Sequence, residues 1–189
     1  MDKLNITIIV GTTRKNRMSI YPAMLVKKIG EEIDEILITF VDVIDFFPLP
    51  GEGNDEESKD SRWVDINKKS DAYIIVAPEY NHGYPGSLKM LLDNDLGNYT
   101  HKPVCIAGVS SGMFGGARMI ENLINPLREM GFVTTHSDLF FPKVQDMFDE
   151  NGELKAEFNS QIDYIKKSFN ELIWMAKCLK WRRDNLDSK

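Results

Sequence analysis

Cysteine and histidine are scarce in this chain of 189 residues. The two cysteines are Cys105, in an apolar run, and Cys178, in a late helical pattern, and neither belongs to a CxxC pair. This excludes a disulfide-stapled scaffold and predicts two reduced thiols in or near the core. The three histidines, at positions 82, 101 and 136, lack the spacing of metal ligands. We therefore expect no metal site.

Positive charge is also in short supply. Lys and Arg number 23 against 29 Asp and Glu, which gives a formal net charge of -6. Nucleic acids and anionic membranes are bound by clustered Lys and Arg, so neither is an expected partner. No apolar run reaches membrane-spanning length, and the amino terminus lacks the basic-then-apolar pattern of a signal peptide. We expect a soluble, cytoplasmic protein in which an anionic ligand needs its own positive site.

Apolar runs rich in β-branched residues alternate with helical patterns along the chain. The runs predict strands over residues 4–10, 36–43, 72–77, 103–109 and 132–135. The patterns predict helices over residues 20–29, 62–70, 87–92, 117–130 and 157–179. The helix from residue 117 is expected to bend or break near Pro126. The acidic segment 45–60 has no periodicity and is expected to be a mobile, exposed loop.

This alternation predicts a parallel sheet with helices on both faces. For a chain of this length we expect a flavodoxin-like α/β fold, with a doubly wound five-stranded parallel sheet in the order 2-1-3-4-5. A single domain should span residues 1–180, followed by a polar tail over 181–189 that frays. The loops after strands one, three and four then converge at the carboxyl edge of the sheet, where such folds bind ligands.

The loop after the first strand carries the donors that a phosphate dianion needs. They are the N–H groups of a helix that begins after the N-cap Ser19, with hydroxyl and guanidinium groups from Thr12, Thr13, Arg14 and Arg17. The alternative is a generic strand-to-helix turn with solvated arginines. A single basic cluster at this place in an acidic protein favours the phosphate interpretation.

Two absent motifs narrow the choice of phosphate-containing ligand. The loop has neither the GxGxxG dinucleotide pattern nor the GxxxxGK[ST] nucleotide loop. A mononucleotide remains, and FMN is its common instance in such a sheet. A charge-assisted hydrogen bond contributes about 1.5–3 kcal/mol, whereas micromolar affinity requires about 8 kcal/mol. The ring system must therefore also be bound, which gives the loops after strands three and four a role.

Three segments resemble one known family. Pro78-Glu79-Tyr80-Asn81, continued by His82-Gly83-Tyr84-Pro85-Gly86-Ser87-Leu88-Lys89, is similar to the signature of the NAD(P)H-dependent FMN reductases, which include quinone, azo-dye and chromate reductases. Residues 11–19 resemble the family's phosphate loop, and Ser110-Ser111-Gly112 with Gly115-Gly116 resembles its third loop. The motifs occur in order and span most of the chain. The family often has serine where Thr12 stands, and threonine keeps the hydroxyl.

The resemblance implies an enzyme in which the flavin performs the chemistry and no side chain is catalytic. NADPH or NADH would reduce FMN, and a small-molecule electron acceptor would reoxidise it in a ping-pong cycle. The family also implies a homodimer or a dimer of dimers. The residues implied to bind FMN are Thr12, Thr13, Arg14, Arg17, Ser19 and Ile20 around the phosphate, Pro78, Glu79, Tyr80 and Asn81 along the ring, and Ser110, Ser111 and Gly112 on its other side.

Several roles stay open at this level. Either Arg14 or Arg17 is the main phosphate partner. Glu79 is expected to order its loop rather than to act as a base, and His82 to be a surface group. Met113 and Phe114 form either a roof over the flavin or a dimer contact. The alternatives to a reductase are a non-catalytic flavin protein, either an electron carrier or a redox sensor, and an α/β binding domain without FMN.

Overall fold

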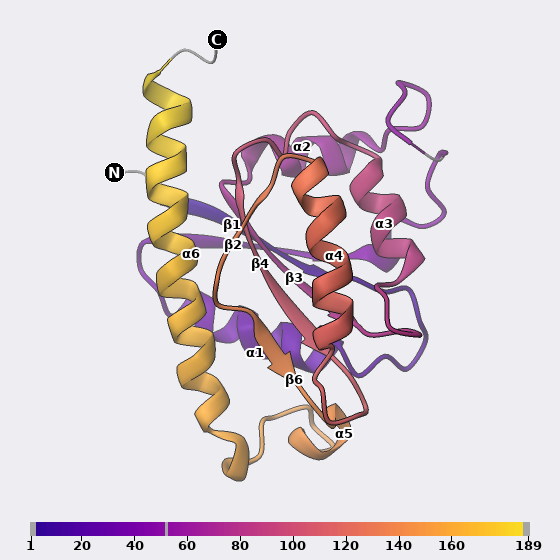
Figure 1. Ribbon diagram of the computed structural model, residues 1–189, viewed down its shortest axis with the longest axis vertical. Helices are drawn as coiled ribbons and strands as arrows, with labels where there is room; N and C mark the ends of the chain where they lie inside the picture. Colours follow the sequence, from indigo (N-terminus) through magenta and orange to yellow (C-terminus); the bar gives the residue numbers. More distant parts are fainter. Residues whose placement is uncertain (1–2, 52, 187–189) are drawn as a thin grey trace.

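The computed structural model describes residues 3–51 and 53–186 and is organised around a parallel sheet (Figure 1). The strands run in the order β2-β1-β3-β4-β5, and β6 lies beside the end of β4. This confirms the predicted flavodoxin-like order. The strands are β1 Leu4–Val10, β2 Ile36–Asp42, β3 Ala72–Pro78, β4 Pro103–Val109, β5 Val133–Thr134 and β6 Leu139–Phe141.

Helices cover both faces of the sheet, as Figure 1 shows. α1 (Ile20–Glu31) and α6 (Ser160–Asn185) pack on one face, and α2 (Ser61–Lys69), α3 (Gly86–Asp93) and α4 (Ala117–Glu129) on the other. Neighbouring residues of one strand therefore enter different cores, since Ile74 packs toward α1 and α6 and Ile75 toward the opposite helices. Burial on both faces is the reason that the strands read as continuous apolar runs.

The fifth sheet position differs from the prediction, because two short strands share it. β5 pairs with Pro103 and Val104 at the start of β4, and β6 pairs with residues 107–109 at its end. Between them the backbone leaves the ladder, and the Glu171 carboxylate accepts the N–H groups of His136 (2.7 Å) and Ser137 (3.0 Å). A side chain on α6 thus replaces the hydrogen bonds of a continuous strand, and the expected five strands become six.

Three helical expectations are corrected. α4 is not interrupted at Pro126, because the buried Leu123 and Leu127 hold both sides of the proline against the core. α6 runs to Asn185, well into the segment expected to be a fraying tail. Cys178 on that helix is exposed, whereas Cys105 is buried as expected.

No helix in the described part of the chain is long and apolar enough to span a membrane.

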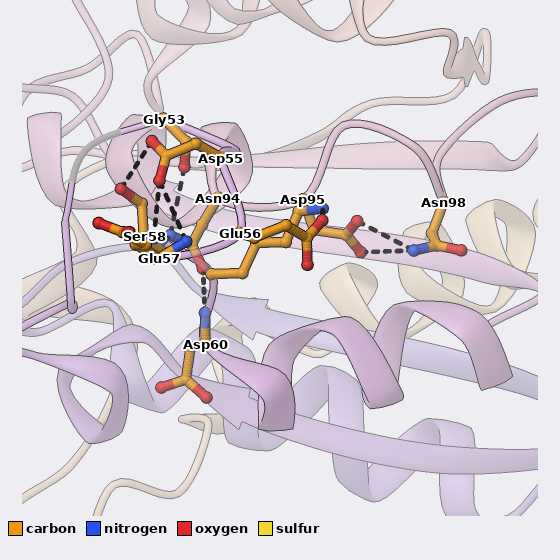
Figure 2. Close-up of polar contacts among 10 residues, drawn as sticks. Gly53, Asp55, Glu56, Glu57, Ser58, Asp60, Asn94, Asp95 and Asn98 are labelled. Carbon is orange, nitrogen blue, oxygen red and sulfur yellow. Dashed lines mark hydrogen bonds and ion pairs between the residues drawn. The ribbon is translucent and has the colours of Figure 1, made fainter.

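The acidic segment before α2 is less exposed than expected. Phe46, in the 3-10 helix η1 (Val43–Phe46), is buried, and so are Ser58 and Asp60. Figure 2 shows how Asn94, from the end of α3, holds this segment. Its amide nitrogen donates to the Ser58 carbonyl (2.6 Å), and its oxygen accepts the Asp60 N–H (2.7 Å). A distant amide that satisfies backbone groups is not visible in the local sequence.

Candidate functional site

The loops that follow β1, β3 and β4 line one cavity of about 400 Å³ at the carboxyl edge of the sheet. The cavity lies where the order β2-β1-β3 reverses direction, which is the usual ligand position in doubly wound folds. Eight of the thirteen residues expected to bind FMN line it, and they come from all three loops: Arg14, Arg17, Ser19, Pro78, Glu79, Tyr80, Ser110 and Ser111. The structure therefore brings the three motifs together.

The other five expected residues, which include Ile20 and Gly112, are not on the wall of this cavity. Thr12, Thr13 and Asn81 line a neighbouring open hollow of about 440 Å³, with Arg14 and Tyr80 shared between the two. The wall also contains residues that the sequence did not single out: Asn16, Met18, Val109, Val144 and Gln145. The last two belong to the short helix α5 (Val144–Met147), and Gln145 donates to the Ser111 carbonyl (3.3 Å).

Two buried donors in the first loop lack a partner. Ser19 occupies the position before α1, yet its hydroxyl makes no capping bond, and within the described residues it has no hydrogen-bond partner. The same holds for Nε of Arg17. Buried polar groups in folded proteins are rarely left unpaired, so an unpaired pair of donors on one cavity wall indicates a ligand position. The positive end of the α1 dipole adds to its attraction for an anion.

The two arginines of this loop differ in their surroundings. Arg17 is half-buried and donates through Nη2 to the carboxylate of Asp42 at the end of β2. Arg14 is exposed, and its guanidinium lies 5.7 Å from the centre of the Tyr80 ring. Thr12 is buried, and its hydroxyl accepts the N–H of Arg14 (3.2 Å) and shares a hydrogen bond of 3.2 Å with the Tyr80 hydroxyl. The Thr12 hydroxyl thus joins the first loop to the second.

The second loop makes a tight turn directly after β3. Tyr80 and Gly83 exchange two backbone hydrogen bonds of 2.9 Å. Asn81 and His82 between them have φ angles of 50° and 67°, as in a type I′ turn. Asparagine tolerates this left-handed conformation, which explains its place in the motif. His82 is exposed and makes its hydrogen bond through its backbone carbonyl to Asn122 (2.7 Å), consistent with a surface side chain.

Glu79 connects this turn to α4. One of its oxygens accepts Nε of Arg118 at 2.8 Å, while the side chain is only 7% exposed. Its other oxygen is buried without a hydrogen-bond partner in the described part of the chain. The sequence expectation that Glu79 orders its loop agrees with the ion pair. Arg118 was missed, because only the fold brings the start of α4 beside this loop.

The third loop depends on close backbone packing. Gly116, directly before α4, has a φ angle of 86°, and a Cβ at this position would lie 2.7 Å from Cα of Gly108 in β4. Only glycine allows both the conformation and the approach. In the same loop Met113 and Phe114 are 70% and 60% exposed. Two large apolar side chains therefore face solvent beside the cavity.

Comparisons with known proteins agree with this arrangement. The model of the family described as NADPH-dependent FMN reductase matches residues 4–146. An NAD(P)H-dependent FMN reductase of Schizosaccharomyces pombe is 27% identical over 180 residues, which cover 88% of this chain and 87% of the relative. A quinone reductase of Pseudomonas putida is 29% identical over 120 residues, covering 59% of this chain and 63% of the relative.

A solved structure shows the same fold. FerB of Paracoccus denitrificans, described as a flavoenzyme NAD(P)H:(acceptor) oxidoreductase, superposes with a TM-score of 0.73. It is 22% identical in sequence, and the match covers 92% of this chain and 98% of FerB.

Proposed function

Because the chain belongs to the NADPH-dependent FMN reductase family, whose members are oxidoreductases that use FMN and NAD(P)H, we propose that it reduces a small oxidised acceptor in a ping-pong cycle. NAD(P)H binds first at the open side of the cavity, transfers hydride and leaves, and an acceptor such as a quinone, azo dye or free flavin takes its place. When bound, FMN would supply the redox chemistry, since its N5 can accept a hydride and the reduced ring can pass two electrons to an acceptor.

The observation that carries this proposal is a pair of buried donors in the first loop, Arg17 Nε and Ser19 Oγ, that have no partner among the residues the structure describes. They fit the phosphate of FMN, since a phosphate dianion has only acceptor oxygens and the α1 amino end adds a favourable dipole. Arg14 is an exposed cation that also lines the cavity. We propose that these groups, with Thr12 and Thr13 in the same loop and Ile20 at the start of α1, hold the phosphate.

The ring would lie between the second and third loops. We propose that residues 78–81 hold one edge of it, largely through backbone groups, and that residues 110–112 close the other side. The type I′ turn and the Glu79–Arg118 ion pair keep the second loop in place before a ligand arrives. Preorganised donors lose little free energy to reorientation, which favours a reduced, electron-rich ring. No side chain of this chain is required as a base.

We also propose a homodimer or a dimer of dimers in the cytoplasm. Met113 and Phe114 support the assembly, since their exposure beside the cavity gives a second copy an apolar surface to cover. Light scattering during size-exclusion chromatography measures the assembly. A monomer at micromolar concentration contradicts this part of the proposal and leaves the reductase activity unaffected.

An anaerobic absorbance spectrum tests the proposed function. The purified protein is loaded with FMN, freed of excess flavin, and scanned before and after NADPH or NADH is added. We expect flavin absorbance that one equivalent of NAD(P)H bleaches, followed by recovery of the spectrum when a quinone is added. A protein that retains FMN but is not bleached by either nucleotide is an electron carrier or sensor. A protein that takes up no FMN contradicts the proposed site.

A further inference from the structure

Asp42, the last residue of β2, lies beside the first loop, and nothing in the three motifs assigns it a role. We propose that Asp42 is a positioning residue, which holds the guanidinium of Arg17 so that the buried Nε stays available to a phosphate oxygen. This inference rests on the proposed function, because it concerns the phosphate end of the FMN site.

Both oxygens of the Asp42 carboxylate are engaged. Oδ2 accepts Nη2 of Arg17, and Oδ1 accepts the N–H of Ile44 (3.2 Å) at the start of η1. The carboxylate is therefore fixed by its own backbone turn before it meets the arginine. The Arg17 and Asp42 side chains are only 16% and 15% exposed, so the ion pair is shielded from water and salt on most sides.

The ion pair uses Nη2 of the Arg17 guanidinium and leaves Nε available to a ligand. Guanidinium is a planar fork, and fixing Nη2 restricts the direction in which Nε–H points. That Nε is buried and has no hydrogen-bond partner among the described residues, and Arg17 and Ser19 line the same cavity. An arginine fixed in this way loses less side-chain entropy when it binds an anion.

Arg14 provides the contrast. It is exposed, forms no ion pair within residues 3–51 and 53–186, and has the ring of Tyr80 as its neighbour. It must be ordered by the ligand, whereas Arg17 is ordered by the protein. The direction in which FMN affinity changes when Asp42 is replaced distinguishes a positioning role from a purely electrostatic one. A carboxylate near a phosphate repels it, so removing the charge alone strengthens binding, while removing the orientation of Arg17 weakens it.

The test compares FMN with riboflavin, which has the same ring system and no phosphate. Flavin is removed from the purified protein, and dissociation constants for both flavins are measured by fluorescence quenching in wild type, Asp42→Asn and Asp45→Asn. We expect Asp42→Asn to weaken FMN by about tenfold and to leave riboflavin unchanged. Asp45→Asn is the matched control, since it removes the same charge three residues away, at an exposed position of η1 that forms no ion pair in the described residues. It should change neither constant.

A double-mutant cycle with Arg17→Ala completes the test. If Asp42 acts through Arg17, Asp42→Asn does not weaken FMN binding once Arg17 is absent, and the loss of a repelling charge then leaves the affinity unchanged or higher. Tighter or unchanged FMN binding in Asp42→Asn overturns the inference. Equal weakening of FMN and riboflavin also overturns it, because it shows a general structural role. Wild-type protein that binds neither flavin overturns the proposed function itself, and that result is visible before any variant is made.

Discussion

At the scale of single residues, a substitution of Ser19 distinguishes two roles for its hydroxyl, capping of α1 and binding of the ligand. A serine before a helix usually stabilises it by accepting a backbone N–H, but the Ser19 hydroxyl makes no such bond. We expect Ser19→Ala to leave the free energy of unfolding within about 0.5 kcal/mol of wild type. The same variant should weaken FMN about tenfold or more, since a hydrogen bond to a charged group contributes about 1.5–3 kcal/mol.

Denaturant unfolding and FMN titration of the same protein sample check both halves of this prediction. Riboflavin again serves as the ligand without a phosphate, and its affinity should not change. A Ser19→Ala protein that is clearly less stable but binds FMN normally shows that the hydroxyl has a capping function in solution, contrary to the geometry.

Asp138, between β5 and β6, is a second residue whose replacement should change the stability of the protein. Burial, together with the nearby Glu121 and Glu171, raises the pKa of this carboxyl from its ordinary value of 3.8 to about 6. The ionised form is therefore disfavoured in the folded protein. This cost is absent below the unfolded pKa, grows as the pH rises through 4 to 6, and is complete at pH 7.

We expect Asp138→Asn to stabilise the protein at pH 7 by about 1–2 kcal/mol. The gain should shrink as the pH falls and disappear near pH 4. Urea unfolding of wild type and variant at pH 4, 5, 6 and 7 measures it, with Asp65→Asn at an exposed position of α2 as the control. A gain that does not depend on pH argues against a perturbed carboxyl.

The residues of the candidate site were predictable where they are neighbours in sequence. Arg14, Arg17 and Ser19 follow one strand, and the residue types alone indicate an anion. Asp42 and Arg118 were not predictable in the same way, because their roles depend on partners 25 and 39 residues away. Local sequence patterns show which hydrogen-bond donors are present, but only the fold shows which of them already have a partner in the protein.

At the scale of elements, the proposed site assigns the phosphate of FMN to the first loop and the ring to the second. The first loop presents buried donors with no partner in the described part of the chain, whereas Asn81 in the second is exposed at the tip of a turn. We expect the double variant Arg14→Ala/Arg17→Ala to weaken FMN by about 100-fold or more, because two charge-assisted contacts are lost. Asn81→Gly, which keeps the left-handed turn, should change the affinity by no more than about threefold.

Retention of FMN through gel filtration, followed by titration, ranks these two variants. Asn81→Gly is preferable to Asn81→Ala here, since alanine adds backbone strain at a φ angle of 50°. The reverse ranking, with strong FMN loss only in the second-loop variant, contradicts the proposed division between phosphate and ring.

Elements were predictable from the sequence wherever one apolar pattern ran without interruption. The strand over 103–109 and the helix start at residue 117 agree with the structure to the residue. β6 was missed because it is only three residues long and follows a segment whose N–H groups are satisfied by Glu171. The interruption expected as one possibility at Pro126 is absent for a similar reason, since tertiary packing outweighed a local breaker.

At the scale of the whole molecule, the two edges of the sheet are specialised differently. The carboxyl edge has the cavity and the unpaired donors. At the opposite edge Lys102, directly before β4, is buried with 8% of its surface exposed and donates to the Asn67 carbonyl (2.6 Å). Asp71 and Asp95 attract its charge, while Arg183 and Lys180 repel it. This edge buries a cation whose hydrogen bond, within residues 3–51 and 53–186, goes to a backbone carbonyl and not to a carboxylate.

That arrangement makes the stability of the whole fold depend on pH in a predictable direction. Burial, together with the positive charge of Arg183, lowers the pKa of Lys102 from its ordinary value of 10.5 to about 8. Below pH 8 the amine is charged in both states, and the folded state bears the full desolvation cost. Between pH 8 and 10.5 the folded protein gives up its proton while the unfolded chain keeps it, so the Lys102 contribution to stability rises with pH.

Lys102→Met removes the titrating amine, so the difference in unfolding free energy between variant and wild type measures the pH dependence that Lys102 causes. The free energy of unfolding of the variant, relative to wild type, should fall by about 1–2 kcal/mol between pH 7 and pH 9.5, because only wild type gains from deprotonation. Lys68→Met, at an exposed position of α2, is the control and should show no such trend. Urea unfolding at both pH values measures the difference. If Lys102→Met and Lys68→Met follow the same pH profile, Lys102 keeps its proton and water reaches it in the folded state.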